Sequence, residues 1–69
     1  RVLAADEQQR AKEAALAAVP GTVTDVDASD DQTSSGTAAY EVDVVAEDGT
    51  EWNVRLDRDF AVLGTSRDN

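Results

Sequence analysis

The chain has 69 residues, enough for one small domain, and a domain of this size buries only about 60% of the surface that its unfolded chain exposes. Because it has no Cys and no His, it can form no disulfide, no zinc site of the usual kind and neither a Ser-His nor a Cys-His catalytic pair. The net charge of −9, with only six Lys and Arg residues, argues against nucleic acid and anionic membranes as partners, and no run of about 18 apolar residues is present to cross a bilayer.

The first predicted element is a helix that follows an N-terminal tail, residues 1–5. Asp6 is the expected N-cap, strong helix formers follow it, and Pro20 ends the segment. The first turn, with Glu7, is expected to project past the core. Since the apolar face is mostly Ala, the helix can lie close to a sheet but buries little area. That face consists of Ala11, Ala15, Ala18 and Val19, with Leu16 at its edge.

Residues 22–28 alternate in the manner of a short strand. Val23 breaks the alternation and is expected to fill the space under the end of the helix. Residues 29–37 contain no large apolar residue and are rich in Ser, Thr, Asp and Gly, which predicts a flexible loop. The strand is expected to direct Thr24, Val26 and Ala28 to one face and Asp25 and Asp27 to the other.

Two further runs of period-2 alternation flank an Asp-Gly pair and predict a β-hairpin. A two-residue loop at this pair would put acidic and core residues on the same face. A three-residue loop, 47–49, with Gly49 left-handed and followed by a G1 bulge, closes the hairpin at Ala46 and Thr50 instead. We expect this second register, because a one-residue slip would send the apolar set into water. Its inward pairs are Val44 with Trp52, Val42 with Val54 and Tyr40 with Leu56.

The same register places the polar residues of the hairpin on the opposite face. Glu41 then lies opposite Arg55, an opposite-charge pair worth a few tenths of a kcal/mol, and Val45 lies opposite Glu51. This outer sheet face is the candidate partner-binding surface. We define it by Glu41, Asp43, Asn53 and Arg55.

A short last strand is expected at residues 60–64, with Phe60 on the same face as Val62, and the polar residues 65–69 are expected to fray as a C-terminal tail. The chain has one Tyr, one Trp and one Phe. Because Tyr40 and Trp52 share a face with the Val residues, we interpret the aromatic residues as core rather than as an exposed recognition platform.

The acidic residues are interpreted as solvated side chains rather than as catalysts or ligands. Acid/base chemistry needs a pocket that desolvates one carboxylate, and so small a chain has little interior from which to form one. A calcium loop starting at Asp25 would need Gly at its sixth position and Glu at its twelfth, where Asp30 and Gly36 stand. Calcium binding by Asp25, Asp27, Asp30 and Asp31 stays a minor alternative, and Asp57 and Asp59 are expected to form turns.

The order of these signals resembles the PepSY domain. The resemblance covers roughly residues 6–63: a helix ending "AALAAVPG", a strand "VTDVDA", a loop, "YEVDVVAEDGTEWNVRLD" and a final "FAVL". The last turn, "DRDFAVL", departs from the family pattern, with Phe60 where a Gly is expected nearby. The resemblance implies an α+β domain in which one helix packs across a curved antiparallel sheet of three to four strands, similar to cystatin-like folds.

The sequence and the resemblance together predict one domain over residues 6–64 with no enzymatic activity, no cofactor and no metal. The resemblance implies an extracellular or cell-envelope module, free-standing or in a lipoprotein, that binds a protein partner and inhibits or modulates a secreted peptidase. The alternative is a structural or assembly module, one of several copies, that associates through a sheet edge as a homo-oligomer. Because the chain starts at Arg1 rather than Met, we expect a processed product or a trimmed segment of an exported protein.

Overall fold

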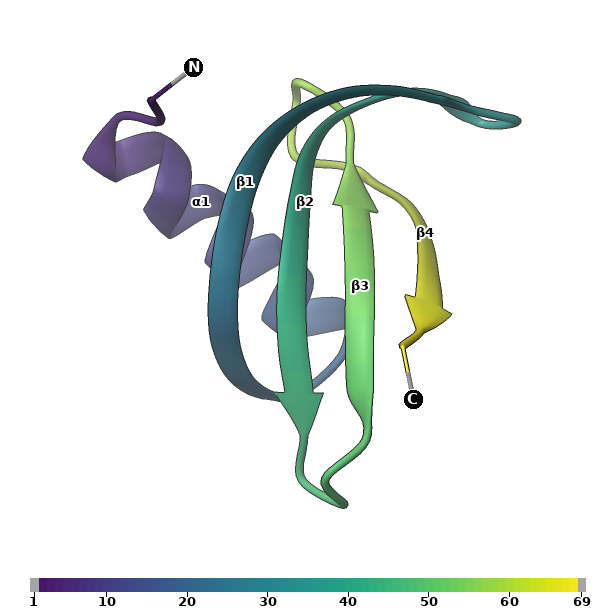
Figure 1. Cartoon of the computed structure of the whole chain (residues 1–69). Coiled ribbons are helices and arrows are strands. Elements are labelled where there is room, and N and C mark those ends of the chain that lie inside the picture. The colour runs from purple at the N-terminus through teal and green to yellow at the C-terminus, as the bar shows by residue number, and fades with distance from the viewer. Residues whose placement is uncertain (1, 69) are drawn as a thin grey trace.

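The computed structural model describes residues 2–68, which form one helix and one four-stranded antiparallel sheet (Figure 1). Figure 1 shows the helix crossing obliquely behind the sheet, while the other face of the sheet is not covered by a helix. The predicted α+β class and the order of elements are therefore confirmed. The elements are α1 (Ala5–Ala18), β1 (Gly21–Thr33), β2 (Gly36–Ala46), β3 (Glu51–Leu56) and β4 (Val62–Arg67), and the strands lie in the order β1-β2-β3-β4.

The turn between β2 and β3 has the predicted three-residue geometry. The Ala46 amide donates to the Thr50 carbonyl oxygen at 2.8 Å, and the Gly49 amide donates to the Ala46 carbonyl oxygen at 2.9 Å. Gly49 has a φ of 87°, a conformation that costs glycine nothing. All the predicted pairs of this hairpin are confirmed, inward and outward alike. They are Tyr40 with Leu56, Glu41 with Arg55, Val42 with Val54, Asp43 with Asn53, Val44 with Trp52 and Val45 with Glu51.

The core lies between α1 and the inner face of β2 and β3. Ala11 and Ala15 are the buried residues of the helix, as predicted, but Ala18 is exposed. Leu3 is buried as well, although it lies in the segment expected to be a tail. Because the helix contributes mainly methyl groups, most of the buried area comes from the sheet. The core cluster is Leu3, Ala11, Ala15, Tyr40, Val42, Val44, Val54 and Leu56.

The helix begins two residues earlier than predicted, and the assignment of Asp6 as its N-cap is wrong. Ala4 is the N-cap, and Asp6 lies in the first turn. The Ala4 amide donates to Oε1 of Glu7 at 3.1 Å, while Oε2 of the same carboxylate accepts from the Tyr40 hydroxyl at 2.7 Å. Glu7 therefore joins the first turn to the sheet, so this turn does not project past the core.

Strand β1 contains a bulge that the sequence pattern did not reveal. The register with β2 shifts between Val23 and Asp25, so Thr24 is exposed instead of facing inward. Its hydroxyl donates to the Asp43 carbonyl oxygen at 3.3 Å. The extra residue lets both Val23 and Val26 pack against the core, although strict alternation would direct them to opposite faces.

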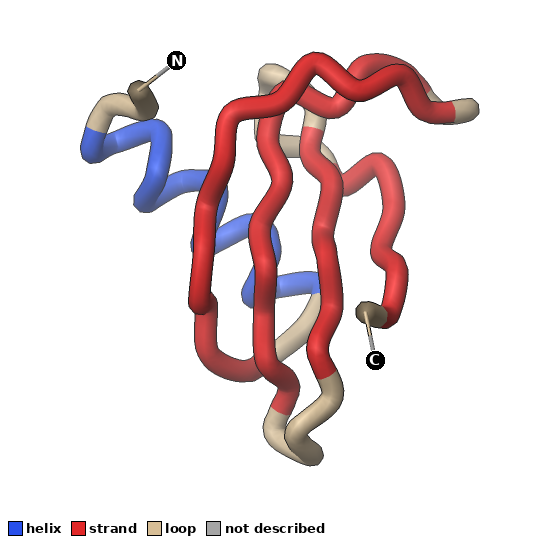
Figure 2. Tube along the Cα trace, in the orientation of Figure 1, coloured by secondary structure: helices blue, strands red, loops and turns tan. Residues whose placement is uncertain are grey.

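The irregular loop predicted at residues 29–37 is instead an arm of paired strand. Strand β1 continues to Thr33 and β2 begins at Gly36, so only residues 34–35 form the turn. The Thr33 hydroxyl donates to the Gly36 carbonyl oxygen at 2.7 Å and so closes the turn. Figure 2 shows the arm bending across the end of the sheet toward β4, which gives the sheet its predicted curvature.

The connection between β3 and β4 is a tight turn organised by Asp57, as expected for this residue. One oxygen of its carboxylate, Oδ1, accepts from the amides of Asp59 at 2.8 Å and Ala61 at 3.0 Å, while the Phe60 amide donates to its carbonyl oxygen at 3.0 Å.

The prediction that Phe60 lies in the last strand is wrong, because Phe60 lies in this turn. Its φ is 66°, a left-handed value that is uncommon outside glycine and incompatible with a strand. Its ring stacks on Tyr40 with centroids 4.9 Å apart and an interplanar angle of 13°, a contact that helps to offset the backbone strain. Strand β4 begins at Val62 and runs to Arg67, so residues 65–67 are paired with β3 rather than frayed. Asn69 lies outside the described residues.

We expect Gly21→Ala to destabilise the domain more than Gly36→Ala does. Both glycines have a positive φ, so both substitutions carry backbone strain. A Cβ at Gly21 would also overlap the Val45 carbonyl oxygen, whereas a Cβ at Gly36 would meet only a side-chain atom of Leu63, at 3.9 Å. The overlap should cost about 1 to 3 kcal/mol beyond the control, a fall in Tm of about 4 to 8 °C per kcal/mol in a domain of this size. Equal melting temperatures for the two variants in circular dichroism would contradict the close approach.

Candidate functional site

The four residues of the outer sheet face lie together as predicted and are linked to neighbouring side chains. Each is half-buried. Oδ1 of Asp43 accepts from the Asn53 side-chain amide at 3.0 Å. Arg55 Nη1 donates to Oδ1 of Asn53 at 3.2 Å and to the Ser66 hydroxyl at 2.9 Å. These bonds hold the polar groups in place across three strands, and they reduce the entropy that a partner would have to remove on binding.

The carboxylates of the outer face are directly opposite other carboxylates of strand β1. Asp25 pairs with Asp43, and Asp27 pairs with Glu41, whose Oε2 also accepts from the Ser29 hydroxyl at 2.7 Å. Like charges directly opposite each other destabilise a sheet. The register arranges these residues in two rows across the strands: Asp25, Asp43, Asn53 and Ser66 in one, and Asp27, Glu41, Arg55 and Gly64 in the other. Arg55 is the basic residue of these two rows.

This concentration of acids perturbs Asp27. A side-chain hydrogen bond with Asp25 and the charge of that carboxylate raise the pKa of Asp27, and the charges of Asp43 and Glu41 raise it further. Asp27 is exposed to solvent, so the cluster lacks the desolvated pocket that acid/base catalysis needs. The arrangement is suited to attracting positive charge rather than to moving protons.

The outer face and the acidic segment of β1 do not form a metal centre among residues 2–68. No group of three or more His, Cys, Asp or Glu side chains in this range converges in a way that could hold a metal ion. The segment 25–31, considered above for calcium, lies in the extended strand β1, where successive side chains point to opposite faces.

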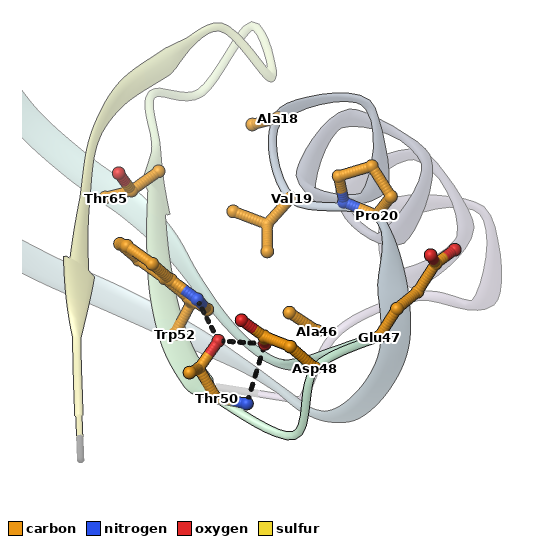
Figure 3. Close-up of a pocket in the computed structure, with 9 residues that line it drawn as sticks. All are labelled: Ala18, Val19, Pro20, Ala46, Glu47, Asp48, Thr50, Trp52 and Thr65. Carbon is orange, nitrogen blue, oxygen red and sulfur yellow. Dashed lines mark hydrogen bonds between the residues drawn. The ribbon is translucent and has the colours of Figure 1, made fainter.

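A second feature, which the sequence did not predict, is a groove on the inner side of the sheet at the end of α1 (Figure 3). It has a volume of about 500 Å³ and opens to solvent. Trp52 lines this groove; it lies on the predicted inner face but is only half-buried and is not in the core cluster, so its assignment to the core is wrong. The groove is lined by Ala18, Val19 and Pro20, by Ala46, Glu47, Asp48 and Thr50, and by Trp52 and Thr65.

Hydrogen bonds fix the polar side of the groove. The Trp52 indole N–H donates to the Thr50 hydroxyl at 2.8 Å, and that hydroxyl donates to Oδ1 of Asp48 at 2.7 Å (Figure 3). The Thr50 side-chain and backbone hydrogen bonds lower the pKa of Asp48, and the charge of Arg67 lowers it further. Asp48 is therefore ionised at neutral pH. The Asp-Gly pair could have indicated the groove, because Asp48 lines it, but from the sequence this pair predicted only the hairpin turn.

Comparison with known proteins links this fold to one family. The family model described as PepSY, peptidase propeptide and YPEB domain, matches residues 7–57. The match includes the strands of the outer face and ends where the last turn departs from the family pattern. No curated protein is a significant match to the chain. The described helix is too short and too polar to cross a membrane.

We expect Asp27→Asn and Asp48→Asn to change stability in opposite directions. Folding raises the pKa of Asp27 above 3.8, so its stabilising contribution is present below that value and is lost as the pH rises through the folded pKa. An Asn stays neutral, so Asp27→Asn should raise Tm at neutral pH and change it little in acid.

For Asp48 the sign is reversed. Folding lowers its pKa from 3.8, so its stabilising contribution is present above that value and is lost as the pH falls through the folded pKa. Asp48→Asn should therefore lower Tm at neutral pH, and the difference should disappear in acid. Melting curves of the two variants across this pH range test both signs, and shifts in the same direction at neutral pH would contradict the electrostatic assignment.

Proposed function

Because the chain belongs to the PepSY family, we propose that it is a non-enzymatic binding and regulatory module that acts outside the cell or in the cell envelope on a protein partner, a secreted peptidase. The description of the family as a peptidase propeptide domain supports a peptidase as the partner. The chemistry of the chain agrees with a binding role, since it has no His or Cys to act as a base or nucleophile.

The observation that carries this proposal is the pairing of like charges on the outer face. Asp25 opposite Asp43 and Asp27 opposite Glu41 weaken the sheet when the domain is alone. A partner that brings Lys or Arg side chains to these rows would relieve the repulsion on binding. The outer face, Glu41, Asp43, Asn53 and Arg55, is therefore the surface that we assign to the partner.

The position of this face also supports a docking role. The helix covers the opposite side of the sheet, so the outer face is open to a large, flat partner surface (Figure 1). Complementary charge mainly accelerates association and selects the correct partner. We therefore expect binding that is faster at low salt.

A structural or assembly role is the second candidate, supported by the edge strand β4. Strand β1, at the other edge, is interrupted by two register shifts and carries several acids, both of which discourage pairing. Strand β4 has a single register shift, at Leu63, and carries no charged residue before Arg67. Val62 at its start is 44% exposed. Two copies that paired through β4 would form a homo-oligomer.

To test the proposed function, the domain is titrated against each metallopeptidase secreted by its source organism, with binding and inhibition measured. Asp43→Asn should weaken binding by about two- to fivefold, the size of one exposed ion pair, and Arg55→Gln should strengthen it because it removes the cation of the outer face. Asp59→Asn, an exposed change of equal charge in the last turn, is the matched control.

Failure of the domain in large excess to bind or slow any of these peptidases would exclude the peptidase as the partner. The molar mass of the domain, measured by light scattering over a range of concentrations, tests the second candidate function, assembly through β4. A mass that rises with concentration supports pairing through β4, and a strict monomer removes that alternative.

A further inference from the structure

The groove at the end of α1 is a separate surface, on the opposite side of the sheet from the outer face. Its walls are mainly apolar: Val19 and Pro20 follow the helix, Ala46 ends β2, and the indole of Trp52 forms one side. Figure 3 shows Val19 and the carboxylate of Asp48 directed toward the same opening beside Trp52. A ligand with an apolar part and a polar end would match this lining.

The charge around the groove is negative. Glu47 and Asp48 form its rim at the hairpin turn, and both are exposed. The helix points its C-terminal end at the groove, and its last turn contains no basic residue, so the partial negative charge of its carbonyl groups is not balanced there. A cation is therefore favoured over a neutral or acidic group.

The chain itself places a guanidinium near this rim. Arg67 is the register partner of Trp52, and its charge acts on Asp48. Arg67 is exposed, so a second cation can compete with it. Trp52 adds an aromatic face held in a fixed orientation by its hydrogen bond to Thr50, and such faces attract guanidinium and ammonium groups.

Strand β4 borders the groove and offers backbone groups to an extended ligand. Thr65 of this strand lines the groove. The Asp68 amide donates to the Glu51 carbonyl oxygen at 2.7 Å, which makes these two residues a hydrogen-bonded pair. Because such pairs alternate along an antiparallel ladder, the peptide groups of Thr65 and Arg67 are directed away from β3, toward the free edge.

We propose that the groove and the edge of β4 together bind an extended segment of a protein partner that carries Arg or Lys two positions away from an aliphatic residue. Side chains two apart in a strand face the same side, so both would enter the groove. The backbone of the segment pairs with β4, the cation lies against Trp52 and reaches Asp48, and the aliphatic group contacts Val19. This site goes beyond the proposed function, because it uses the inner side of the sheet and does not depend on the outer face.

The chain provides its own reporter, since Trp52 is its single Trp. The probe is the capped peptide acetyl-Thr-Val-Thr-Arg-Thr-Val-Thr-amide, titrated into the intact domain while Trp emission is followed. We expect a saturable change. A peptide with Glu in place of Arg should give none, and the rearranged peptide Thr-Thr-Val-Arg-Val-Thr-Thr, whose Val residues face away from the Arg side, should bind more weakly.

Variants of the domain locate the cation. Asp48→Asn should weaken the Arg peptide by about two- to fivefold, and Arg67→Gln should tighten it because the competing guanidinium is removed. Asp31→Asn, which removes the same charge on the β1–β2 arm, should leave the affinity unchanged. Circular dichroism confirms that each variant is folded under the conditions of the titration.

Three results would overturn the site. The first is no saturable change in Trp emission at millimolar peptide. The second is an equal loss for Asp48→Asn and Asp31→Asn, which would mean attraction to the net charge of the whole domain. The third is acetyl-arginine amide binding as tightly as the peptide, which would exclude pairing with β4.

Discussion

The three-residue turn at 47–49 is the constraint on which the rest of the sheet depends. With Gly49 left-handed, the turn closes at Ala46 and Thr50 and fixes which residues of β2 and β3 lie opposite each other. The inner face then receives the large apolar residues of the hairpin except Val45, which lies opposite Glu51 on the outer face. The same register places the polar residues Glu41, Asp43, Asn53 and Arg55 on the outer face. One turn therefore determines both the core and the candidate binding surface.

The core that this register creates is thin, and contacts at its margin complete it. The helix buries methyl groups of Ala11 and Ala15, which allows close packing but provides little area. Glu7 compensates at one end by accepting hydrogen bonds from both the Ala4 amide and the Tyr40 hydroxyl. Phe60 compensates at the other end, where its ring stacks on Tyr40 despite a left-handed backbone. Tyr40 is thus the residue through which the helix, the hairpin and the last turn are connected.

The features that could be predicted from sequence were those set by local periodicity. The hairpin register followed from the parity of residues around Asp48, because only one register keeps the apolar set together. The bulge at Thr24 could not be predicted, since it arises from packing two Val residues of β1 under the helix. The β1–β2 arm was missed for a related reason. Its pairing depends on backbone hydrogen bonds and on Thr33 in the turn, and neither produces a pattern of hydrophobicity.

Of the two candidate sites, the outer face could be predicted from local periodicity and the groove could not. Glu41, Asp43, Asn53 and Arg55 were placed together by register alone, and the structure adds their hydrogen bonds and the opposing acids of β1. The groove required tertiary information, because Val19 and Trp52 are distant in sequence and Trp52 has the parity of a core residue.

What leaves Trp52 half-exposed is the direction of the helix, which crosses obliquely behind the sheet and ends beside β3 (Figure 1). The helix packs mainly on β1, β2 and β3 and contacts β4 least. A domain with so small a helix cannot bury both ends of its sheet. Each surface that we assign to a partner therefore lies where the core does not reach: the outer face, which no helix covers, and the groove, where the one helix stops.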